Sequence, residues 1–423
     1  MELQTITSKR TGDCYYKLKH PTGLDIFLYP KAGSSTTYAV LGTKYGSIDN
    51  CFQRDDETEP VTVPAGIAHF LEHKLFESED GDAFQRYAKT GASANAATEF
   101  ESTCYLFSCT DRLYESLEIL LDFVQSPYFT EQTIKKEQGI IGQEIRMYDD
   151  DPQWRVMFNY LQAMYHTHPV RIDIGGTIES IAQITPEHLY RCYRTFYNLN
   201  NMALAVSGNF QVEKVLEVCD STLKPSEPIQ VKRVFQPEPE TVVSPYVEQR
   251  LSVAMPLFQF GYKESIQGAL KERDIAAVEI LLEILASDAS PLFHSLLERG
   301  LVNESSFGYE YFEGTGYATV MFSGESKDPQ AVADAISAEF QRLSEEGISE
   351  EVFEYSKRAV YGEIIAALNS TSSISNALIS FSLKGRELFT YIDTLVQLKL
   401  EEVQKKLSLF EKEKSVLSVV RPL

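Results

Sequence analysis

The pentapeptide His69-x-x-Glu72-His73 constrains the fold of this chain more than any other feature. On a helix, His69 and His73 are one turn apart, so both imidazoles leave the same face. Two neutral imidazoles are common ligands of a catalytic zinc ion, which then needs a third protein ligand from elsewhere in the fold. A neighbouring carboxylate, here Glu72, is suited to act as the base for a water that the metal acidifies. The pentapeptide therefore predicts a helix that meets a second element carrying a metal ligand.

The alternative is an ordinary surface helix with two histidines and a glutamate on its polar face, because short motifs also occur by chance. Apolar side chains at Ile67, Phe70, Leu71 and Phe76 instead predict an amphipathic, partly buried helix over 66–76. This pattern favours the metal site.

A second helix is predicted over 130–148, with Thr130 as its candidate N-cap. Glu137 and Glu144 are seven residues apart, which is two helical turns, and therefore share a face. One of them can bind the metal while the other holds a ligand histidine by a hydrogen bond. Two solvated carboxylates on a surface helix are the alternative.

The order of motifs along the chain resembles the pitrilysin/insulinase family of inverzincin zinc peptidases, which includes the mitochondrial processing peptidases. The resemblance rests on segments 66–77, 91–98, 103–105, 168–176, 184–189 and 207–209, together with Glu137, Glu144, Tyr197 and Asn201. It implies that His69, His73 and Glu144 bind one Zn²⁺ ion per chain. It further implies that Glu72 is the general base and that Glu137 orients a ligand histidine.

The resemblance also places Asn95 and Ala96 on an edge strand that binds an extended peptide by β-augmentation. The residues support a strand independently, because 93–107 alternates small, polar and aromatic side chains. Without the resemblance, Asn95 would be assigned to a turn.

The chain is predicted to consist of two domains, residues 1–222 and 246–423, joined by a linker over 223–245 that is rich in proline and charge. Shifting by 219 residues superposes the helical pattern of 131–145 on 350–364 and places Glu144 on Glu363. The second half contains a single histidine, His294, which restricts the predicted metal chemistry to the first half. In the family, two such domains face each other across a cleft.

The expected fold class is α+β, with largely antiparallel sheets packed against helices, because strands and helices intermix without regular β-α-β phasing. Helices are predicted over 66–76, 113–124, 130–148, 154–165, 186–197, 276–286, 329–345 and 350–368, and strands over 36–45, 202–207, 250–255 and 317–322.

Composition excludes several partners. The net charge of -22 disfavours nucleic acid and anionic membranes, and is compatible with neutral or basic peptides. No apolar run is long enough for a membrane span, and residues 1–10 do not resemble a signal peptide. Six cysteines without a Cys-x-x-Cys pair predict reduced thiols and a cytoplasmic location.

Active family members supply an arginine and a tyrosine from their second domain to hold the substrate. Here Leu297 falls at the arginine position, and Asn303 or Glu304 falls near the tyrosine position; Arg299 and Tyr309 are close but out of register. We therefore expect the zinc-bearing subunit of a heterodimer whose partner is a homologous metal-free chain. A homodimer is the second possibility.

Two functions are consistent with these features. The first is a zinc metallo-endopeptidase acting on short or unfolded peptides, with processing of a precursor or leader peptide as one possible role. The second is a non-catalytic peptide-binding or structural subunit, which is disfavoured because all four motif positions are present. His166 and His168 form a further histidine pair, for which Pro169 favours a structural role.

Overall fold

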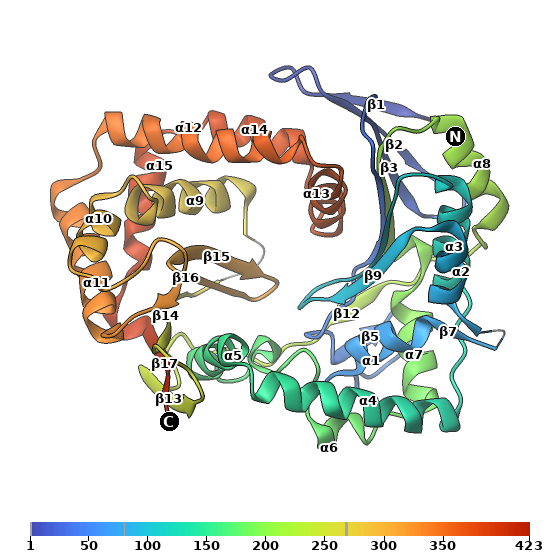
Figure 1. Ribbon diagram of the computed structural model, residues 1–423, viewed down its shortest axis with the longest axis horizontal. Helices are drawn as coiled ribbons and strands as arrows, with labels where there is room; N and C mark the ends of the chain where they lie inside the picture. The colour runs from blue at the N-terminus through green and yellow to red at the C-terminus, as the bar shows by residue number, and fades with distance from the viewer. Residues whose placement is uncertain (1, 80, 267–269) are drawn as a thin grey trace. The chain divides into compact units, whose positions relative to one another are not determined.

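A computed structural model describes residues 2–79, 81–266 and 270–423, which form two compact units (Figure 1). Unit 1 consists of Met1–Ile145, Asp173–Val234 and Ile365–Phe389, and unit 2 of Arg146–Ile172, Phe235–Ile364 and Thr390–Leu423. Each unit combines a β-sheet with packed helices, so the predicted α+β class is confirmed.

Unit 1 is built on a seven-stranded mixed sheet in the order β1-β2-β3-β11-β4-β10-β9. Its strands are β1 (Gln4–Thr7), β2 (Cys14–Lys19), β3 (Asp25–Pro30), β4 (Thr37–Thr43), β9 (Ser93–Thr98), β10 (Thr103–Cys109) and β11 (Met202–Gly208). All neighbours pair antiparallel except β3 and β11. Strand β9 lies at one edge of this sheet, as predicted for Asn95 and Ala96.

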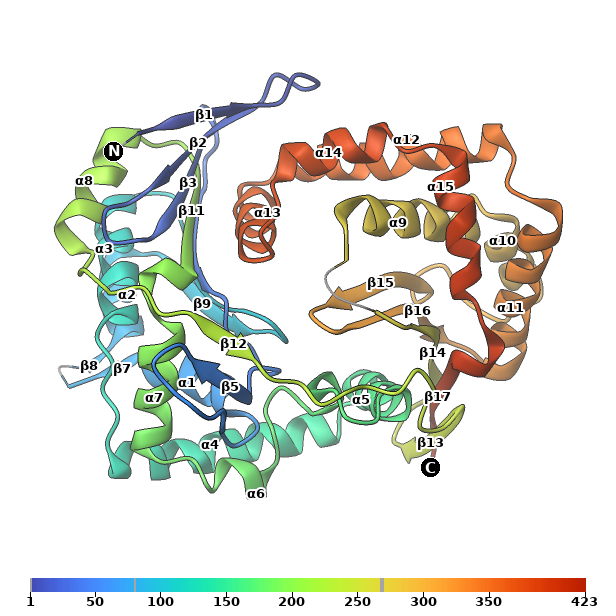
Figure 2. The ribbon, with the colours of Figure 1, turned by 180° about the vertical axis from the view of Figure 1, so that it is seen from behind.

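Helices cover both faces of this sheet. The helices that lie within unit 1 are α1 (Ile67–Leu75), α2 (Ala83–Thr90), α3 (Leu113–Val124), α6 (Ile178–Ile181), α7 (Pro186–Phe196), α8 (Val212–Thr222) and α13 (Thr371–Leu383). Helix α13 packs on β4 and β11, on the side opposite α2, α3 and α8 (Figure 2). Short strands form a three-stranded sheet, β5 (Cys51–Arg54), β6 (Val61–Thr62) and β12 (Val231–Arg233), and a hairpin, β7 (Glu77–Ser78) and β8 (Gly81–Asp82).

Unit 2 contains a five-stranded sheet in the order β13-β17-β14-β16-β15. Its strands are β13 (Tyr246–Leu251), β14 (Leu257–Glu264), β15 (Gly308–Gly314), β16 (Tyr317–Glu325) and β17 (Ser415–Pro422). Its helices are α5 (Pro152–Met164), α9 (Glu272–Ala286), α10 (Pro291–Glu298), α11 (Pro329–Glu346) and α15 (Leu400–Lys405). Helix α5 packs on β13, β14 and β17.

Three helices carry the chain from one unit to the other: α4 (Glu131–Asp149), α12 (Glu350–Ala367) and α14 (Leu388–Val396). Helices α4 and α12 begin 219 residues apart, and α5 and α13 correspond residue for residue under the same shift. Each half of the chain therefore gives one helix to the unit built mainly from the other half. The structure thus matches the predicted repeat. The domain boundaries predicted at 222 and 246 assume two continuous segments, whereas each compact unit also contains a helix from the other half of the chain.

Two strand predictions are wrong. Residues 93–107 form two antiparallel strands instead of one, because the chain reverses at a turn in which the Glu99 amide donates to the Ser102 carbonyl (2.8 Å). The strand expected over 250–255 lies earlier, at Tyr246–Leu251, where it pairs with β17.

All six cysteines are free thiols, as predicted. Among the described residues, no single helix has the length and apolar character needed to cross a membrane; one bent pair of helices, α12 with α13, meets the requirement on length and composition alone.

Candidate functional site

Helix α1 starts at a glycine that the packing requires. Gly66 has φ +85, and a Cβ atom on it would lie 2.3 Å from the carbonyl oxygen of Gly175. Likewise, a Cβ atom on Gly176, which has φ +73, would lie 2.5 Å from the carbonyl oxygen of Ala65. Because only glycine fits both the left-handed backbone and this close approach, the turn at 175–176 fixes where α1 begins. Residue His69 follows one turn later and is buried.

Helices α1 and α4 lie side by side and bring three candidate ligands together (Figures 1 and 2). One donor atom from each of His69, His73 and Glu144 lies within 4.8 Å of the others. Nε2 of His69 is 3.6 Å from Oε1 of Glu144, and Nε2 of His73 is 3.5 Å from Oε2. The predicted set of three side chains therefore converges on one point.

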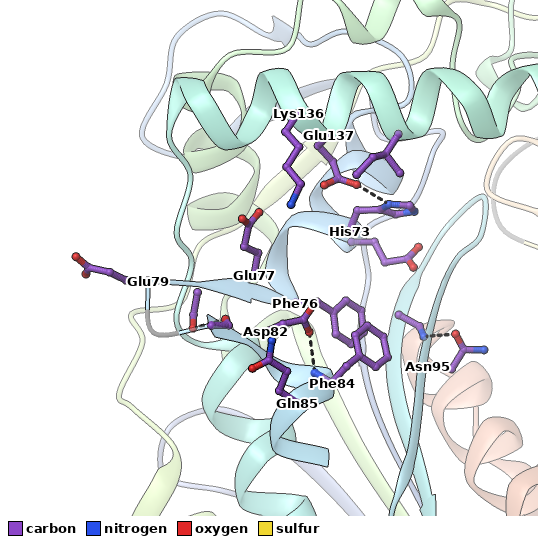
Figure 3. A pocket seen from close by; sticks show the side chains of 15 residues that line it. His73, Phe76, Glu77, Glu79, Asp82, Phe84, Gln85, Asn95, Lys136 and Glu137 are labelled. Carbon is purple, nitrogen blue, oxygen red and sulfur yellow. Dashed lines mark hydrogen bonds and ion pairs between the residues drawn. The ribbon is translucent and has the colours of Figure 1, made fainter. Parts of the chain in front are cut away.

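The ring nitrogens of both histidines are suited to a metal. Oε1 of Glu137 lies 3.0 Å from Nδ1 of His73 (Figure 3), so the proton resides on Nδ1 and the Nε2 lone pair remains available. Burial, together with the neighbouring His73, lowers the pKa of His69 to about 3, so this imidazole is neutral at physiological pH. For His73, burial lowers the pKa, but the hydrogen bond to Glu137 and the surrounding carboxylates outweigh it and raise the pKa overall.

Glu72 lies between the metal ligands and strand β9. Its carboxylate is buried, and Oε2 accepts a 2.7 Å hydrogen bond from Oγ1 of Thr98. Burial raises the pKa of Glu72, and the hydrogen bond from Thr98 offsets this only in part. A carboxylate with a raised pKa is suited to accepting and returning a proton.

The outer edge of β9 is free for pairing among the described strands, because β10 is its one neighbour. Asn95 and Ala96 lie in the middle of this strand, and the Ala96 amide donates to Asn95 Oδ1 (2.9 Å; Figure 3). The Ala96 N–H therefore points away from β10. Because alternate residues of a strand face the same side, the N–H groups of Ala94 and Thr98 point the same way.

A pocket of about 610 Å³ adjoins Glu72, His73 and the free edge of β9. Its lining includes an aromatic pair, Phe76 and Phe84, stacked with ring centroids 4.5 Å apart. Phe84 remains 46% exposed. The remaining lining residues are Glu77, Ser78, Glu79, Gly81, Asp82, Gln85, Asn95, Ala96, Lys136, Glu137 and Ile140 (Figure 3). The pocket combines two aromatic rings with several charged side chains, and its lining includes one of the candidate ligands, His73.

The structure brings together every residue predicted for the site: His69, Glu72, His73, Glu137, Glu144, Asn95 and Ala96. Sequence reasoning gave no role to Thr98 or Phe84, although both stand in or near the quoted motifs. A buried lysine, Lys74, was also missed; its amine pairs with Glu77 on the wall of the pocket. A lysine directly after His73 in an apolar helix was the signal that could have identified this pair.

Unit 2 contains the residues that lie at or near the family positions of the substrate-holding arginine and tyrosine. Leu297 is half-buried on α10, and Arg299 is exposed at the end of that helix. The hydroxyl of Tyr309 donates to Glu283 (2.6 Å), and burial with this bond raises the pKa of Tyr309. His168 accepts a bond from the Val170 amide and has Nε2 3.0 Å from the Thr315 carbonyl, which agrees with its predicted structural role.

Two family models match the chain. Residues 60–178 match "Insulinase (Peptidase family M16)", and residues 183–360 match "Peptidase M16 inactive domain". The first match contains all the candidate metal ligands.

Individual proteins extend this likeness over the whole length. A protein of Bacillus subtilis named "Uncharacterized zinc protease YmfH" is 41% identical over 408 residues, covering 95% of each chain. The crystal structure of a putative M16-like peptidase from Alicyclobacillus acidocaldarius superposes with a TM-score of 0.92 at 33% identity, over 100% of this chain and 99% of that one. The probable β-subunit of the mitochondrial-processing peptidase of Arabidopsis thaliana is 24% identical over 77% of this chain and 63% of its own.

Proposed function

The chain belongs to the insulinase family of peptidases, family M16, and on this premise we propose that it is a zinc-dependent endopeptidase for short or unfolded peptides. The observation that carries the proposal is the convergence of His69, His73 and Glu144 beside the buried Glu72. The names of its relatives, several of which are zinc proteases, support the same activity.

We assign one zinc ion per chain to His69, His73 and Glu144. The donor set fits zinc because it offers two imidazoles and one carboxylate, the ligand types of three-residue catalytic zinc sites. The buried Nδ1 of His69 has no hydrogen-bond partner among the described residues, so His69 lacks the kind of orienting contact that Glu137 gives His73. When bound, zinc supplies a Lewis acid that polarises the scissile carbonyl and lowers the pKa of water.

The protein side chains then perform the proton transfers. Glu72 accepts a proton from the attacking water and delivers it to the leaving amine, a task that its raised pKa favours. Glu137 holds the imidazole of His73 in one tautomer and one orientation. Together, these contacts keep the base and the ligands aligned before a substrate arrives.

The substrate is held as an added strand on β9. A peptide carbonyl can replace Asn95 Oδ1 as the acceptor of the Ala96 N–H, which gives binding without sequence preference. One peptide side chain, aromatic or long and aliphatic, enters the pocket over Phe84. Only an extended segment can pair in this way, which restricts substrates to short or unfolded chains, including leader peptides of precursors.

A metal-free homologous subunit completes the enzyme. By the family resemblance, Leu297 falls at the position of the substrate-holding arginine and Asn303 or Glu304 falls near that of the tyrosine. Tyr309, which is close by, is hydrogen-bonded to Glu283. The Arabidopsis relative is itself named as a subunit. The proposed heterodimer predicts that the purified chain cleaves peptides slowly alone and faster with its partner; equal rates would favour a self-sufficient chain or a homodimer. We further propose a cytoplasmic location.

The alternative is a peptide-binding subunit without catalysis. Cleavage of a quenched fluorescent peptide library by the zinc-loaded chain, alone and in its native complex, separates the two functions. The Glu72→Gln variant should retain zinc and lose at least about 100-fold in rate, because general-base catalysis contributes about 10²–10⁴. A variant as active as wild type would exclude Glu72 as the base, and an inactive native complex would favour the binding function.

A further inference from the structure

Thr98 connects the peptide-binding strand to the base. It is the last residue of β9, directly opposite Thr103 on β10. Its hydroxyl donates to Oε2 of Glu72 at 2.7 Å, a short, charge-assisted hydrogen bond. No other side chain on β9 hydrogen-bonds Glu72 among the contacts of the described residues.

The direction of this hydrogen bond is fixed by its surroundings. Oγ1 of Thr103 lies 3.4 Å from Oγ1 of Thr98, but Thr103 donates its own proton to the Tyr45 carbonyl at 2.8 Å. A carboxylate accepts and does not donate, so the single hydroxyl proton of Thr98 is directed to Glu72. The Oε1 atom of the carboxylate then remains available for the reaction.

Thr98 also marks the end of the free edge. The N–H groups of Ala94, Ala96 and Thr98 face the side on which a peptide would pair, and Thr98, the last residue of the strand, holds Glu72 through its hydroxyl. A docked peptide that pairs with Ala94 and Ala96 therefore reaches the Glu72 carboxylate where β9 ends. This arrangement places the backbone of the peptide beside the base at the point where pairing stops.

We propose that Thr98 is a positioning residue for the base: it holds Glu72 by one oxygen at the end of the docking edge, so that one strand both binds the peptide and aligns the carboxylate. The inference rests on the proposed peptidase function. It goes further by assigning the alignment of Glu72 to the substrate-binding strand instead of to the metal ligands.

The kinetic test compares Thr98→Val, which keeps the shape and removes the hydroxyl, with Thr98→Ser, which keeps the hydroxyl. In the native complex, Thr98→Val should lower kcat about 10-fold with KM and zinc content unchanged, while Thr98→Ser stays near wild type. Thr62→Val, on β6, is the matched control, because the one hydrogen bond that its hydroxyl donates among the described residues goes to Cys51 Sγ at 3.5 Å. A Thr98→Val variant with unchanged kcat, or with raised KM alone, would overturn the inference.

A second measurement does not depend on activity. In crystal structures of the metal-free protein, Thr98→Val should displace the Glu72 carboxylate from its wild-type position, whereas Thr98→Ser should keep it there. An unchanged Glu72 carboxylate in Thr98→Val would overturn the inference. If Glu72→Gln keeps full activity, the proposed base is wrong; if Glu72→Gln is inactive and Thr98→Val matches wild type, only the role of Thr98 is wrong.

Discussion

Nδ1 of His73 lies 3.0 Å from Oε1 of Glu137, two helical turns before Glu144 on the same helix. One helix thus supplies both a ligand candidate and the group that orients another ligand. We expect Glu137→Ala to weaken zinc binding by about 10–100-fold, because a histidine without its hydrogen-bond partner loses a fixed tautomer and orientation. Competition with a chromogenic chelator measures the affinity. The exposed Glu131→Ala on the same helix is the control, and equal affinities in the two variants would contradict the role of Glu137.

Gly66→Ala should lower the free energy of unfolding by more than the cost of placing alanine in a left-handed backbone conformation. The new Cβ would lie 2.3 Å from the Gly175 carbonyl, and the positive φ adds a cost of about 1–2 kcal/mol. Gly12→Ala separates the two effects, since Gly12 has φ +77 with nothing within 4 Å of its Cβ position. Urea unfolding measures both variants. Equal losses of stability would show that the contact with Gly175 relaxes freely.

Phe84→Ala should change the preference for substrate side chains and leave zinc binding intact. Removing this exposed ring takes away an aromatic contact in the pocket, so peptides with an aromatic residue in this subsite should lose several-fold in kcat/KM. Peptides with glycine there should be cleaved as by wild type. A uniform loss across the peptide library would contradict a role in selecting side chains.

Glu238 should make unit 2 sensitive to acid. Its carboxylate accepts the backbone amides of His166, Thr167 and His168, each at 2.8 Å, and Lys263 Nζ at 2.6 Å. Although burial opposes ionisation, these bonds lower the pKa of Glu238 from 4.5 to about 2. The folded pKa is below the unfolded one, so the stabilisation is complete above pH 4.5 and is lost as the pH falls toward 2. Its full size is on the order of 3 kcal/mol.

Denaturant unfolding between pH 2 and pH 6 measures this contribution. Glu238→Gln should have a flatter pH dependence than wild type, whereas Glu240→Gln, a neighbouring exposed carboxylate, should not. Parallel curves for all three proteins would contradict the assignment to Glu238.

The local part of the site could be predicted from sequence because it depends on helix geometry. His69, Glu72 and His73 lie within five consecutive residues, and the spacing of Glu137 and Glu144 places both on one face of α4. Only the resemblance to a family assigned Glu144 to the metal, because each glutamate could equally have been solvated.

The remaining part depends on contacts between distant segments. The hydroxyl of Thr98 reaches Glu72 because the end of β9 meets α1. Position 66 has no room for a side chain because the Gly175 carbonyl lies against it. Likewise, the exchange of α5 and α13 between units follows from where α4 and α12 end, which no local pattern encodes. Periodicity identifies elements, but it does not identify the partners against which they pack.

The central claim is that three side chains hold one zinc ion, and metal titration tests it most directly. Isothermal titration of the metal-free protein with zinc, for wild type, His69→Ala, Glu144→Ala and the distant control His294→Ala, compares the proposed ligands with a histidine outside the site. The account predicts one tight site per chain in wild type and His294→Ala, and its loss in His69→Ala and Glu144→Ala. Undiminished tight binding in either ligand variant, or no tight binding in wild type, would contradict it.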